Sequence, residues 1–373
     1  MLKIKQAQTK KDLTDFIKFP WKIYKNDHNW VAPLISERKE FFTPEKNPFF
    51  KHSDVEFFLA KKNKEIVGRI CGVVNYNHVD FHNEKAGFFG FFECIDDFDV
   101  AKLLLDTVRK WLKSKGMEIM RGPVNFSTND EVGFLLEGFE SPPVFMMTYN
   151  PKYYLDLVER YGMQKAKDLY AWYFDKSFKP SEKIIRIAEK IEKKENLKVR
   201  TVDLKDFENE IKRIKQIYNS AWSRNWGFVP MTDEEFDHLC KNLKQIIDPQ
   251  MVFIAEIDSE PVGFSLALPN INPVLKKLNG RLYPFGILKL LWFTKIKNIV
   301  KGVRIITMGV VDTHRKKGIE TLFYIRTIKD GIERGYSWAE MSWVLEDNIL
   351  MNKALETLGA ELYKKYRIYE MRI

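Results

Sequence analysis

The sequence predicts a mixed α/β fold that occurs twice along the chain. In each half an alanine is followed eight residues later by a glycine, with a charged turn between, which is typical of two paired strands. A long amphipathic helix ending at glycine comes next, then an asparagine thirteen residues beyond that glycine. A shorter helix closing on glycine and an aromatic strand complete each half. Matches in the same order indicate a tandem duplication.

The elements of the first half are strands around Ala60 and Gly68, a helix over 100–116, Asn129 and a helix over 153–162. Those of the second half are strands around Ala255 and Gly263, a strand over 305–311, a helix over 319–335, Asn348 and a helix over 351–359. A polar Ser/Lys/Pro stretch near 176–181 separates the halves, so we expect domains over 1–176 and 177–373. The irregular alternation of helices and strands predicts a mixed sheet with helices on both faces.

Length and composition agree with this division and exclude several classes of protein. A chain of 373 residues exceeds one comfortable core. The net charge of +10 suits polyanionic ligands, but the basic residues alternate with acidic ones, as over 183–198, which argues against nucleic acid. Three scattered cysteines indicate a reducing compartment. The first residues lack a signal-peptide core and no apolar run spans a bilayer, so we expect a cytoplasmic protein.

The residues over 313–320 form the most informative segment. The apolar strand over 305–311 runs into a basic, glycine-containing loop that opens the helix over 319–334. Free N–H groups of a first helical turn, the helix dipole and cationic side chains then converge on one point, which predicts a site for a phosphate or pyrophosphate. A plain strand-to-helix turn is the structural alternative.

The corresponding loop of the first half has the opposite charge. It contains Asp96, Asp97 and Asp99 at the start of the helix. Aspartates there favour the helix dipole but repel phosphate. Only the second half is therefore expected to hold the anion, and we interpret the first as a degenerate copy with a structural or acceptor-binding role.

This order of strand pair, strand, Arg-x-x-Gly loop, helix, strand, asparagine and short helix resembles the GNAT superfamily of acyl-CoA N-acyltransferases. The resemblance covers most of both halves and implies two tandem GNAT-like acyl-CoA N-acyltransferase domains, as in an uncharacterised bacterial tandem-GNAT group. Arg315 and Gly318 match the family's phosphate loop. Glu320 departs from it, because that position is normally Gly or Ala, and a carboxylate there opposes a pyrophosphate by about 1 kcal/mol when solvated.

The resemblance also implies an acyl-CoA co-substrate, acetyl-CoA or one with a longer chain. Its pantetheine would lie along the strand before the loop, and its pyrophosphate at the loop. The implied cofactor-binding residues are Met308, Gly309, Val310, Val311, Arg315, Lys316, Lys317, Gly318, Ile319 and Asn348. Glycine inside a strand often marks close approach by a ligand, although a bulge is the alternative for Gly309. A helix N-cap is the alternative for Asn348.

Acyl transfer to an amine needs a base, a stabilised oxyanion and a proton for the leaving thiolate. Asp312 and Glu340 are the candidate bases, Glu340 because strand alternation places it opposite Ala339 and Met341, where burial would raise its pKa. An ordinary ion-paired strand carboxylate is the alternative. The family often uses a tyrosine seven residues after the asparagine as general acid; that position here is Leu355, so water is the alternative donor.

The acceptor is expected beside the loop over 221–230, which in the resembling family lines the side opposite the donor. Its Trp222, Asn225 and Trp226 suit a wall around an organic amine, and interface packing is the alternative reading of the two indoles. Asn129 lies in a polar loop of the first half that can contribute to acceptor recognition or form a surface connection.

An insertion over 281–301 separates the strand pair of the second half from its phosphate strand. Within it, the segment 285–301 reads as a basic amphipathic helix with Trp292 at its edge. Such a helix is typical of peripheral membrane contact or of a lid over an acyl chain, and an interdomain helix is the alternative. No metal is expected, since His78 and His82 have no evident third ligand.

Together these features predict an acyl-CoA-dependent N-acyltransferase acting on a small-molecule or lipidic amine. The alternatives are a noncatalytic tandem GNAT-like binding module and a Fem-like aminoacyl or peptidyl transferase. The expected location is cytoplasmic, with peripheral membrane contact through 285–301 as a further prediction.

Overall fold

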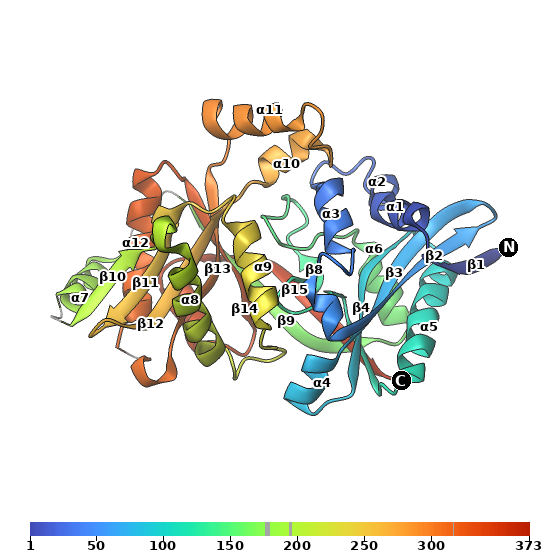
Figure 1. The fold of residues 1–373 in the computed structure, drawn as a ribbon, viewed down its shortest axis with the longest axis horizontal. Coiled ribbons are helices and arrows are strands. Elements are labelled where there is room, and N and C mark those ends of the chain that lie inside the picture. The colour runs from blue at the N-terminus through green and yellow to red at the C-terminus, as the bar shows by residue number, and fades with distance from the viewer. Residues whose placement is uncertain (176–179, 194–195, 316) are drawn as a thin grey trace. The chain divides into compact units, whose positions relative to one another are not determined.

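The computed structural model describes residues 1–175, 180–193, 196–315 and 317–373, and it leaves the side chain of Lys295 undescribed. The described chain forms two units (Figure 1). Unit 1 comprises Met1–Leu169, Asn272–Lys297 and Lys364–Ile373, and unit 2 comprises Tyr170–Ile271 and Asn298–Tyr363. The predicted boundary near 176–181 lies partly outside the described residues. Each unit is therefore assembled from separate stretches of sequence.

Unit 1 contains, in chain order, β1 (Leu2–Gln6), α1 (Lys10–Lys18), α2 (Pro20–Ile23), α3 (Ile35–Phe41), η1 (Pro48–Lys51), β2 (Ser53–Lys62), β3 (Glu65–Asn75), α4 (Tyr76–His82), β4 (Ala86–Cys94), α5 (Phe98–Ser114), β5 (Ile119–Gly122), β6 (Val124–Asn125), β7 (Glu131–Val132), β8 (Phe134–Glu137) and α6 (Tyr153–Arg160). It also holds the insertion, with α10 (Asn272–Leu278), α11 (Gly286–Leu291) and the π-helix η4 (Trp292–Ile296). The predicted amphipathic helix over 285–301 is thus shorter and ends at Ile296.

Unit 2 contains α7 (Glu182–Glu192), β10 (Leu197–Thr201), η2 (Leu204–Asp206), α8 (Phe207–Ala221), α9 (Asp233–Leu243), η3 (Pro249–Met251), β11 (Val252–Ile257), β12 (Glu260–Pro269), β13 (Gly302–Val310), η5 (Asp312–His314), α12 (Ile319–Glu333), β14 (Trp338–Leu345) and α13 (Ile349–Thr357). Two further strands, β9 (Gln164–Asp175) and β15 (Glu361–Arg372), have residues in both units. The predicted mixed α/β fold is confirmed.

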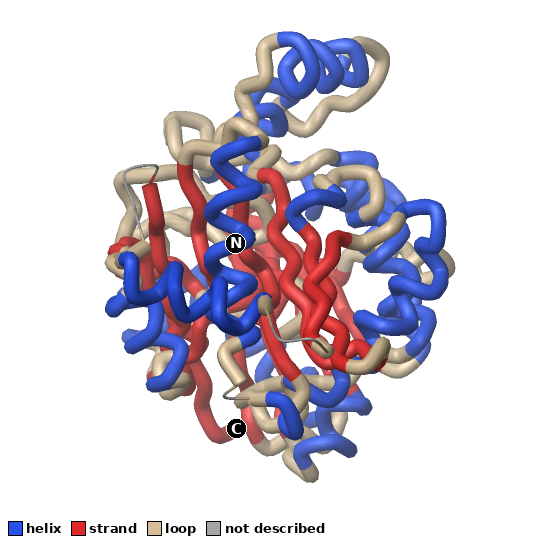
Figure 2. Tube along the Cα trace, turned by 90° about the vertical axis from the view of Figure 1, so that its left-hand side faces the viewer, coloured by secondary structure: helices blue, strands red, loops and turns tan. Residues whose placement is uncertain are grey.

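Strand order within each unit follows one plan. Unit 1 has the order β1-β2-β3-β4-β5-β15, and unit 2 has β9-β14-β13-β12-β11-β10. Each unit contains a parallel pair, β4 with β5 in unit 1 and β13 with β14 in unit 2. A parallel pair needs a crossover connection, and the long helices α5 and α12 supply it. Figure 2 shows helices lying on both sides of the strands.

The repeated strand pairs have the same register in both units. Ala60 pairs with Gly68 on β2 and β3, and Ala255 pairs with Gly263 on β11 and β12. In both hairpins the register shifts immediately after the alanine. One extra residue, Val67 on β3 or Val262 on β12, therefore bulges from the second strand. The eight-residue spacing in the sequence therefore corresponds to one structural device used twice.

Two apolar clusters cover the faces of the unit 2 sheet. On one face, α12 and α7 pack on β13 through residues such as Leu322, Phe323 and Ile191. On the other face, α8 packs on β11 and β12 through Ile217 and Phe264. Successive side chains of a strand point to opposite faces of the sheet. Alternate residues of β13 and β14 therefore face α12, and the residues between them face away from it.

One buried histidine of unit 1 gives the fold a pH dependence. His78 on α4 is 2% exposed, and burial together with the nearby His82 lowers its pKa to about 4. An unfolded histidine titrates near ~6.5, so the unfolded chain binds one more proton between that pH and 4. The stability that His78 contributes is present above pH ~6.5 and is lost as the pH falls towards 4, by up to ~3 kcal/mol. The free energy of unfolding, measured by urea titration at several pH values in this range, should therefore fall less steeply with decreasing pH in His78→Gln than in the unmodified protein. An equal pH dependence in the two proteins would contradict the assignment.

Candidate active site

The two central strands of unit 2 part at the site. The ladder between β13 and β14 ends at the pair Ile305 and Met341, although β13 continues to Val310 and β14 to Leu345. On its other edge β13 stays paired with β12, with a register shift that leaves Ile306 as an extra residue. A bulge bends and twists its strand, so the bulge at Ile306 explains why the two strands separate at this point.

The loop after β13 turns sharply into α12 at Gly318. This residue is the N-cap and has φ +84°, in the left-handed region that glycine adopts without steric cost. No side chain of the described residues caps this helix end. Among the described residues the Glu320 carboxylate makes no hydrogen bond, so it does not seal the N–H groups of the first turn. The amides of this turn are therefore available to an anion.

The cationic residues of the loop have different tasks. Arg315 donates to the carbonyl of Ala221 at 2.6 Å and forms an ion pair with Asp312 at 3.0 Å. Arg224 forms a second ion pair with Asp312, at 3.1 Å. Lys316 lies outside the described residues. The guanidinium of Arg315 is thus held against the end of α8, whereas the exposed Lys317 remains the cation nearest the start of α12 among the described loop residues.

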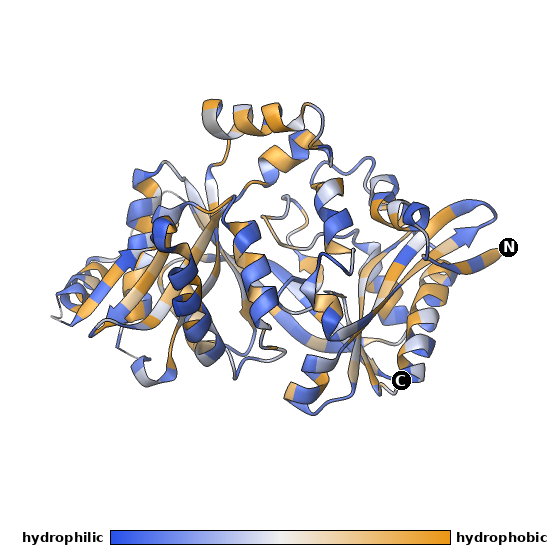
Figure 3. Ribbon diagram, in the orientation of Figure 1, coloured by the Kyte–Doolittle hydropathy of each residue, from blue (hydrophilic) through white to orange (hydrophobic). Residues whose placement is uncertain are grey.

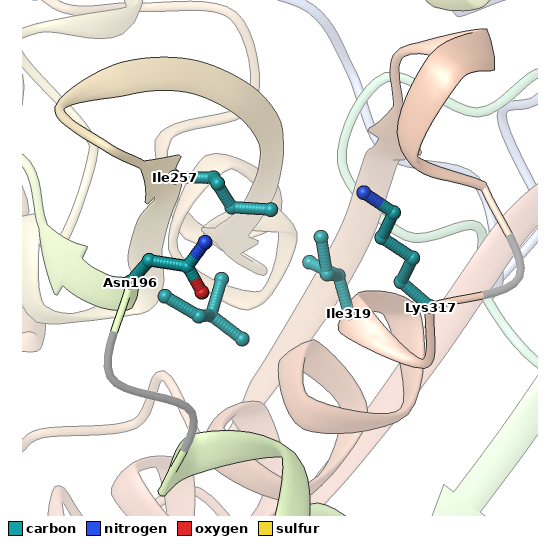
Figure 4. A pocket seen from close by; sticks show the side chains of 5 residues that line it. Asn196, Ile257, Lys317 and Ile319 are labelled. Carbon is teal, nitrogen blue, oxygen red and sulfur yellow. The ribbon is translucent and has the colours of Figure 1, made fainter.

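A pocket of about 310 Å³ lies beside this helix start. It is lined by Asn196, Leu197, Ile257, Lys317 and Ile319. Figure 4 shows Lys317 and Ile319 on one side and Asn196 and Ile257 on the other. One amine, one amide and three apolar side chains make a small mixed surface next to the unsealed N–H groups of α12.

The indole ring of Trp222 leaves no room for a side chain at position 309. A Cβ built at Gly309 would lie 2.4 Å from Cη2 of Trp222. The bulge of β13 falls at Ile306 instead. Packing of Trp222 against the strand therefore explains the glycine, and a bulge at Gly309 itself is excluded. A pantetheine contact at Gly309 stays a prediction. Of the other predicted strand residues, Met308 and Val310 have buried side chains in the cluster with α12, and Val311 is half-buried.

Substituting Gly309 tests this packing. Gly309→Ala should lower the free energy of unfolding by ~1–3 kcal/mol, because the added methyl overlaps the Trp222 ring. Gly331→Ala is the matched control: its Cβ on α12 meets only ordinary contact with Met251, and loss of a helical glycine should stabilise by ~0.5–1 kcal/mol. Urea titration compares the variants, and equal effects would contradict the placement of Trp222.

Asn348 serves α13 as its N-cap. Its side chain accepts a hydrogen bond from the N–H of Met351 at 3.3 Å. A second asparagine, Asn352, donates to the carbonyl of Leu345 at 2.9 Å and accepts from the indole of Trp172 at 3.0 Å. Leu355, at the position of the family tyrosine, is fully buried in the core. A CoA contact by Asn348 stays a prediction.

Glu340 belongs to a buried polar network. It is fully buried, and its ladder partner across the parallel strands is Arg304. The Ser342 hydroxyl donates to one Glu340 oxygen and the Tyr363 hydroxyl donates to the other. Arg304 in turn donates to the Ser342 hydroxyl at 2.9 Å. Met341 packs in the α12 cluster, so this network occupies the opposite face of the sheet.

Sequence reasoning found only one member of this network. Arg304 and Tyr363 were not selected as site residues, although a charged residue inside each of two apolar strands is a sign that the charges meet. Tyr363 is only partly buried, and its ring centroid lies 5.4 Å from that of Tyr173. It is therefore the least buried end of a chain of hydrogen bonds that leads to Glu340.

The predicted acceptor wall consists of residues at the end of α8. Trp222 stacks on Tyr218 with ring centroids 5.1 Å apart and also contacts Phe264. Asn225 and Trp226 follow in a turn and are partly buried. Trp222 thus has a structural task in the α8 core, and its predicted acceptor contact stays a prediction. Asn129 lies in unit 1, where its N–H donates to the Ser127 hydroxyl at 3.1 Å.

Unit 1 closes its own copy of the site. Its parallel pair also separates, after Phe88 and Arg121. Beyond that point the Asn125 side chain accepts from the N–H of Phe91 at 2.8 Å, and the carbonyl of Val124 lies only 2.1 Å from a Cβ built at Gly90. The protein's own backbone therefore fills the space that is expected to admit a pantetheine in unit 2.

Two absences among the described residues bear on cofactors and membranes. No group of three or more His, Cys, Asp or Glu in this part of the chain is arranged to hold a metal ion. No helix there combines the length and apolarity that crossing a bilayer requires.

Comparison with known proteins finds two relatives that match along nearly the whole of this chain, and solved structures that share its fold. No protein-family model matches the chain. Protein YghO of Escherichia coli (strain K12) is 39% identical over 371 residues, covering 98% of this chain and 94% of that protein. The bacterial ceramide synthase of Caulobacter vibrioides (strain NA1000 / CB15N) is 37% identical over 377 residues, covering 99% and 97%. A solved tandem GNAT protein from the clavulanic acid biosynthesis pathway has a TM-score of 0.60 at 8% identity, covering 100% of this chain and 98% of that chain. That likeness is one of fold and confirms the predicted tandem GNAT architecture.

Proposed function

The chain belongs to the family of Protein YghO and the Caulobacter bacterial ceramide synthase, and on this premise we propose that unit 2 transfers an acyl group from a CoA thioester to a lipidic amine. It is an acyltransferase of the GNAT fold. The observation that carries the proposal is the combination in unit 2 of parting central strands with an unsealed helix start at Gly318. In unit 1 the central strands also part, but the unit's own residues occupy the space between them.

The donor end of the site suits the anionic part of CoA. N–H groups of the first turn of α12 and the dipole of this helix favour a diphosphate, and Lys317 adds a positive charge. Arg315 acts indirectly, by holding Asp312 and the end of α8 in place. The Glu320 carboxylate still repels the diphosphate, and Lys317 and the helix dipole offset this repulsion only in part. We therefore expect a moderate affinity for acyl-CoA. The N–H groups along the free edge of β13 would bind the pantetheine and polarise the thioester carbonyl.

A lipidic acceptor is supported by the name of one relative. A ceramide is the amide of a fatty acid with a long-chain amino alcohol, so the Caulobacter protein's name describes amide formation on a lipid amine. We extend this acceptor class to the present chain, with a long-chain acyl-CoA as donor.

The reaction forms an amide C–N bond and breaks the thioester C–S bond. The amine must lose a proton, and the departing thiolate must gain one. We assign the first transfer to Tyr363 and Glu340: the tyrosine oxygen accepts the proton of the amine while its own proton passes to the Glu340 carboxylate. Ser342 and Arg304 orient that carboxylate. Asp312 is engaged by two arginines and is assigned a positioning role instead.

The test is a direct assay of amide formation. Purified protein is incubated with acetyl-CoA or palmitoyl-CoA and a long-chain amino alcohol; thiol release is followed by a colour reaction, and the amide by mass spectrometry. We expect the N-acyl product with the long-chain donor. Thiol release without amide would reassign the protein as a thioesterase-like hydrolase. Neither product, together with no binding of either donor, would favour the noncatalytic module.

A further inference from the structure

The insertion that interrupts unit 2 in sequence is built into unit 1 in structure. Its first helix, α10, is anchored by the Asn272 side chain, which donates to the carbonyl of Pro143 at 2.7 Å. At the end of α10, Asn279 accepts from the indole of Trp21 at 2.9 Å, and the carbonyl of Gly280 accepts from the N–H of Ile35 at 3.0 Å. These contacts hold the base of the insertion in place.

Beyond this base, α11 and η4 leave apolar side chains in solvent. Seven of the fifteen exposed large hydrophobic side chains among the described residues lie within 283–296. The most exposed are Tyr283, Phe285, Leu288 and Ile296, each at 66–69%, followed by Leu291 and Trp292. Figure 3 shows the predominance of hydrophobic residues along α11. Scattered exposed hydrophobics are ordinary, but a contiguous group on one element marks an interaction surface.

The charge of this surface is of one sign. The run 261–311 contains no aspartate or glutamate, whereas 272–301 contains seven lysines and arginines. Lys289 and Lys297 lie within or directly after the apolar helix and are exposed. The segment 272–301 thus contributes +7 to the chain's net charge of +10, in the part of the chain where apolar side chains are exposed. A partner for this surface must offer an apolar region to the exposed hydrophobic side chains and negative charges to the lysines around them.

We propose that α11 and η4 dock on the surface of an anionic lipid bilayer. The segment 286–296 is about 16 Å long at ~1.5 Å per residue, too short to span a ~30 Å hydrocarbon layer. Tyr283, Phe285 and Trp292 suit the interfacial region, where aromatic rings bridge headgroups and acyl chains. The lysines meet anionic headgroups, and Leu288 and Ile296 enter the apolar layer. This docking requires no step of acyl transfer, because vesicle binding is measured without donor or acceptor.

Vesicle flotation with the full chain tests the inference. Vesicles of phosphatidylcholine alone are compared with vesicles that also contain anionic phosphatidylglycerol, at low and high salt. We expect at least ~10-fold more bound protein on the anionic vesicles, falling as salt screens the lysines. The double variant Leu288→Glu/Trp292→Glu should lose at least ~10-fold of this binding, and circular dichroism and thermal unfolding should be unchanged because both side chains are already exposed.

A matched control is available on another helix. Ile349 and Leu350 at the start of α13 in unit 2 are also exposed, at 54% and 78%. Ile349→Glu/Leu350→Glu makes the same chemical change elsewhere and should leave flotation unaltered. The inference is overturned when the unmodified protein stays unbound on both vesicle types, or when the two double variants lose binding equally. It is also overturned when light scattering finds a dimer that only the α11 variant dissociates and no vesicle binding, since the surface would then bind a second copy.

Discussion

Replacing Glu340 with glutamine is expected to lower kcat for amide formation by about 10²- to 10⁴-fold. The carboxylate is fully buried and accepts hydrogen bonds from the hydroxyl groups of Ser342 and Tyr363. Glutamine preserves its shape but cannot take up the proton that Tyr363 would pass on. Steady-state kinetics with saturating acyl-CoA measures the effect, and titration calorimetry should show an unchanged donor affinity.

The control separates catalysis from stability. Glu361→Gln makes the same change at an exposed position on β15 and should keep full activity. Removing a buried charge that has a charged neighbour can also destabilise a fold, so thermal unfolding is recorded for both variants. Tyr363→Phe is the second test: it leaves the Glu340 charge in place, and we expect a similar loss of kcat with a changed pH profile. Wild-type rates in both Glu340→Gln and Tyr363→Phe would remove this pair from the mechanism.

Replacing Gly318 with alanine is expected to weaken acyl-CoA binding by at least ~10-fold. Alanine in the left-handed region costs ~1–2 kcal/mol, and its Cβ would lie 2.3 Å from Cδ1 of Ile191 on α7. The first turn of α12 must then shift, which moves its N–H groups away from the diphosphate. Titration calorimetry with acyl-CoA measures the change in Kd.

The opposite end of α12 supplies the control. Gly335 has the same φ of +84°, and nothing lies within 4 Å of a Cβ built there. Gly335→Ala should therefore cost a similar amount of backbone stability and leave acyl-CoA affinity unchanged. The double variant Gly318→Ala/Ile191→Ala removes the side-chain overlap and shows how much of the loss comes from crowding. Equal affinities in Gly318→Ala and Gly335→Ala would mean that the loop is not the phosphate site.

Local patterns in the sequence predicted much of unit 2. Glycine at the end of a basic loop predicted the helix start at Gly318, and the amphipathic periodicity predicted the end of α12 to within two residues of Glu333. The Ala-to-Gly spacing predicted hairpins whose register is the same in both units. These features depend on residues close together in the chain, where backbone preferences and side-chain periodicity act directly.

Features that depend on distant residues were not predictable in the same way. The Glu340 network joins β13, β14 and β15, and only the fold brings Arg304 and Tyr363 to one carboxylate. The reason for Gly309 lies in Trp222, a residue on α8 far away in sequence. The insertion was predicted to be amphipathic, but no sequence pattern indicates that it belongs to unit 1 or that Asn272 donates a hydrogen bond to Pro143.

The charge of the first loop predicted a difference in anion binding between the two halves, and the structure adds a second, steric difference. Asp97 does cap α5, as expected for an acid at a helix start. The larger obstacle is the backbone after β5, with Asn125 bonded to Phe91. That obstruction is steric, and composition alone contains no sign of it.

Calorimetric titration of the intact protein with palmitoyl-CoA and acetyl-CoA tests the central claim most directly. We expect heat of binding with a stoichiometry of one donor molecule per chain, because unit 2 has the unsealed helix start and unit 1 fills its own site. Absence of heat with both donors, or two equivalent sites per chain, would contradict this account.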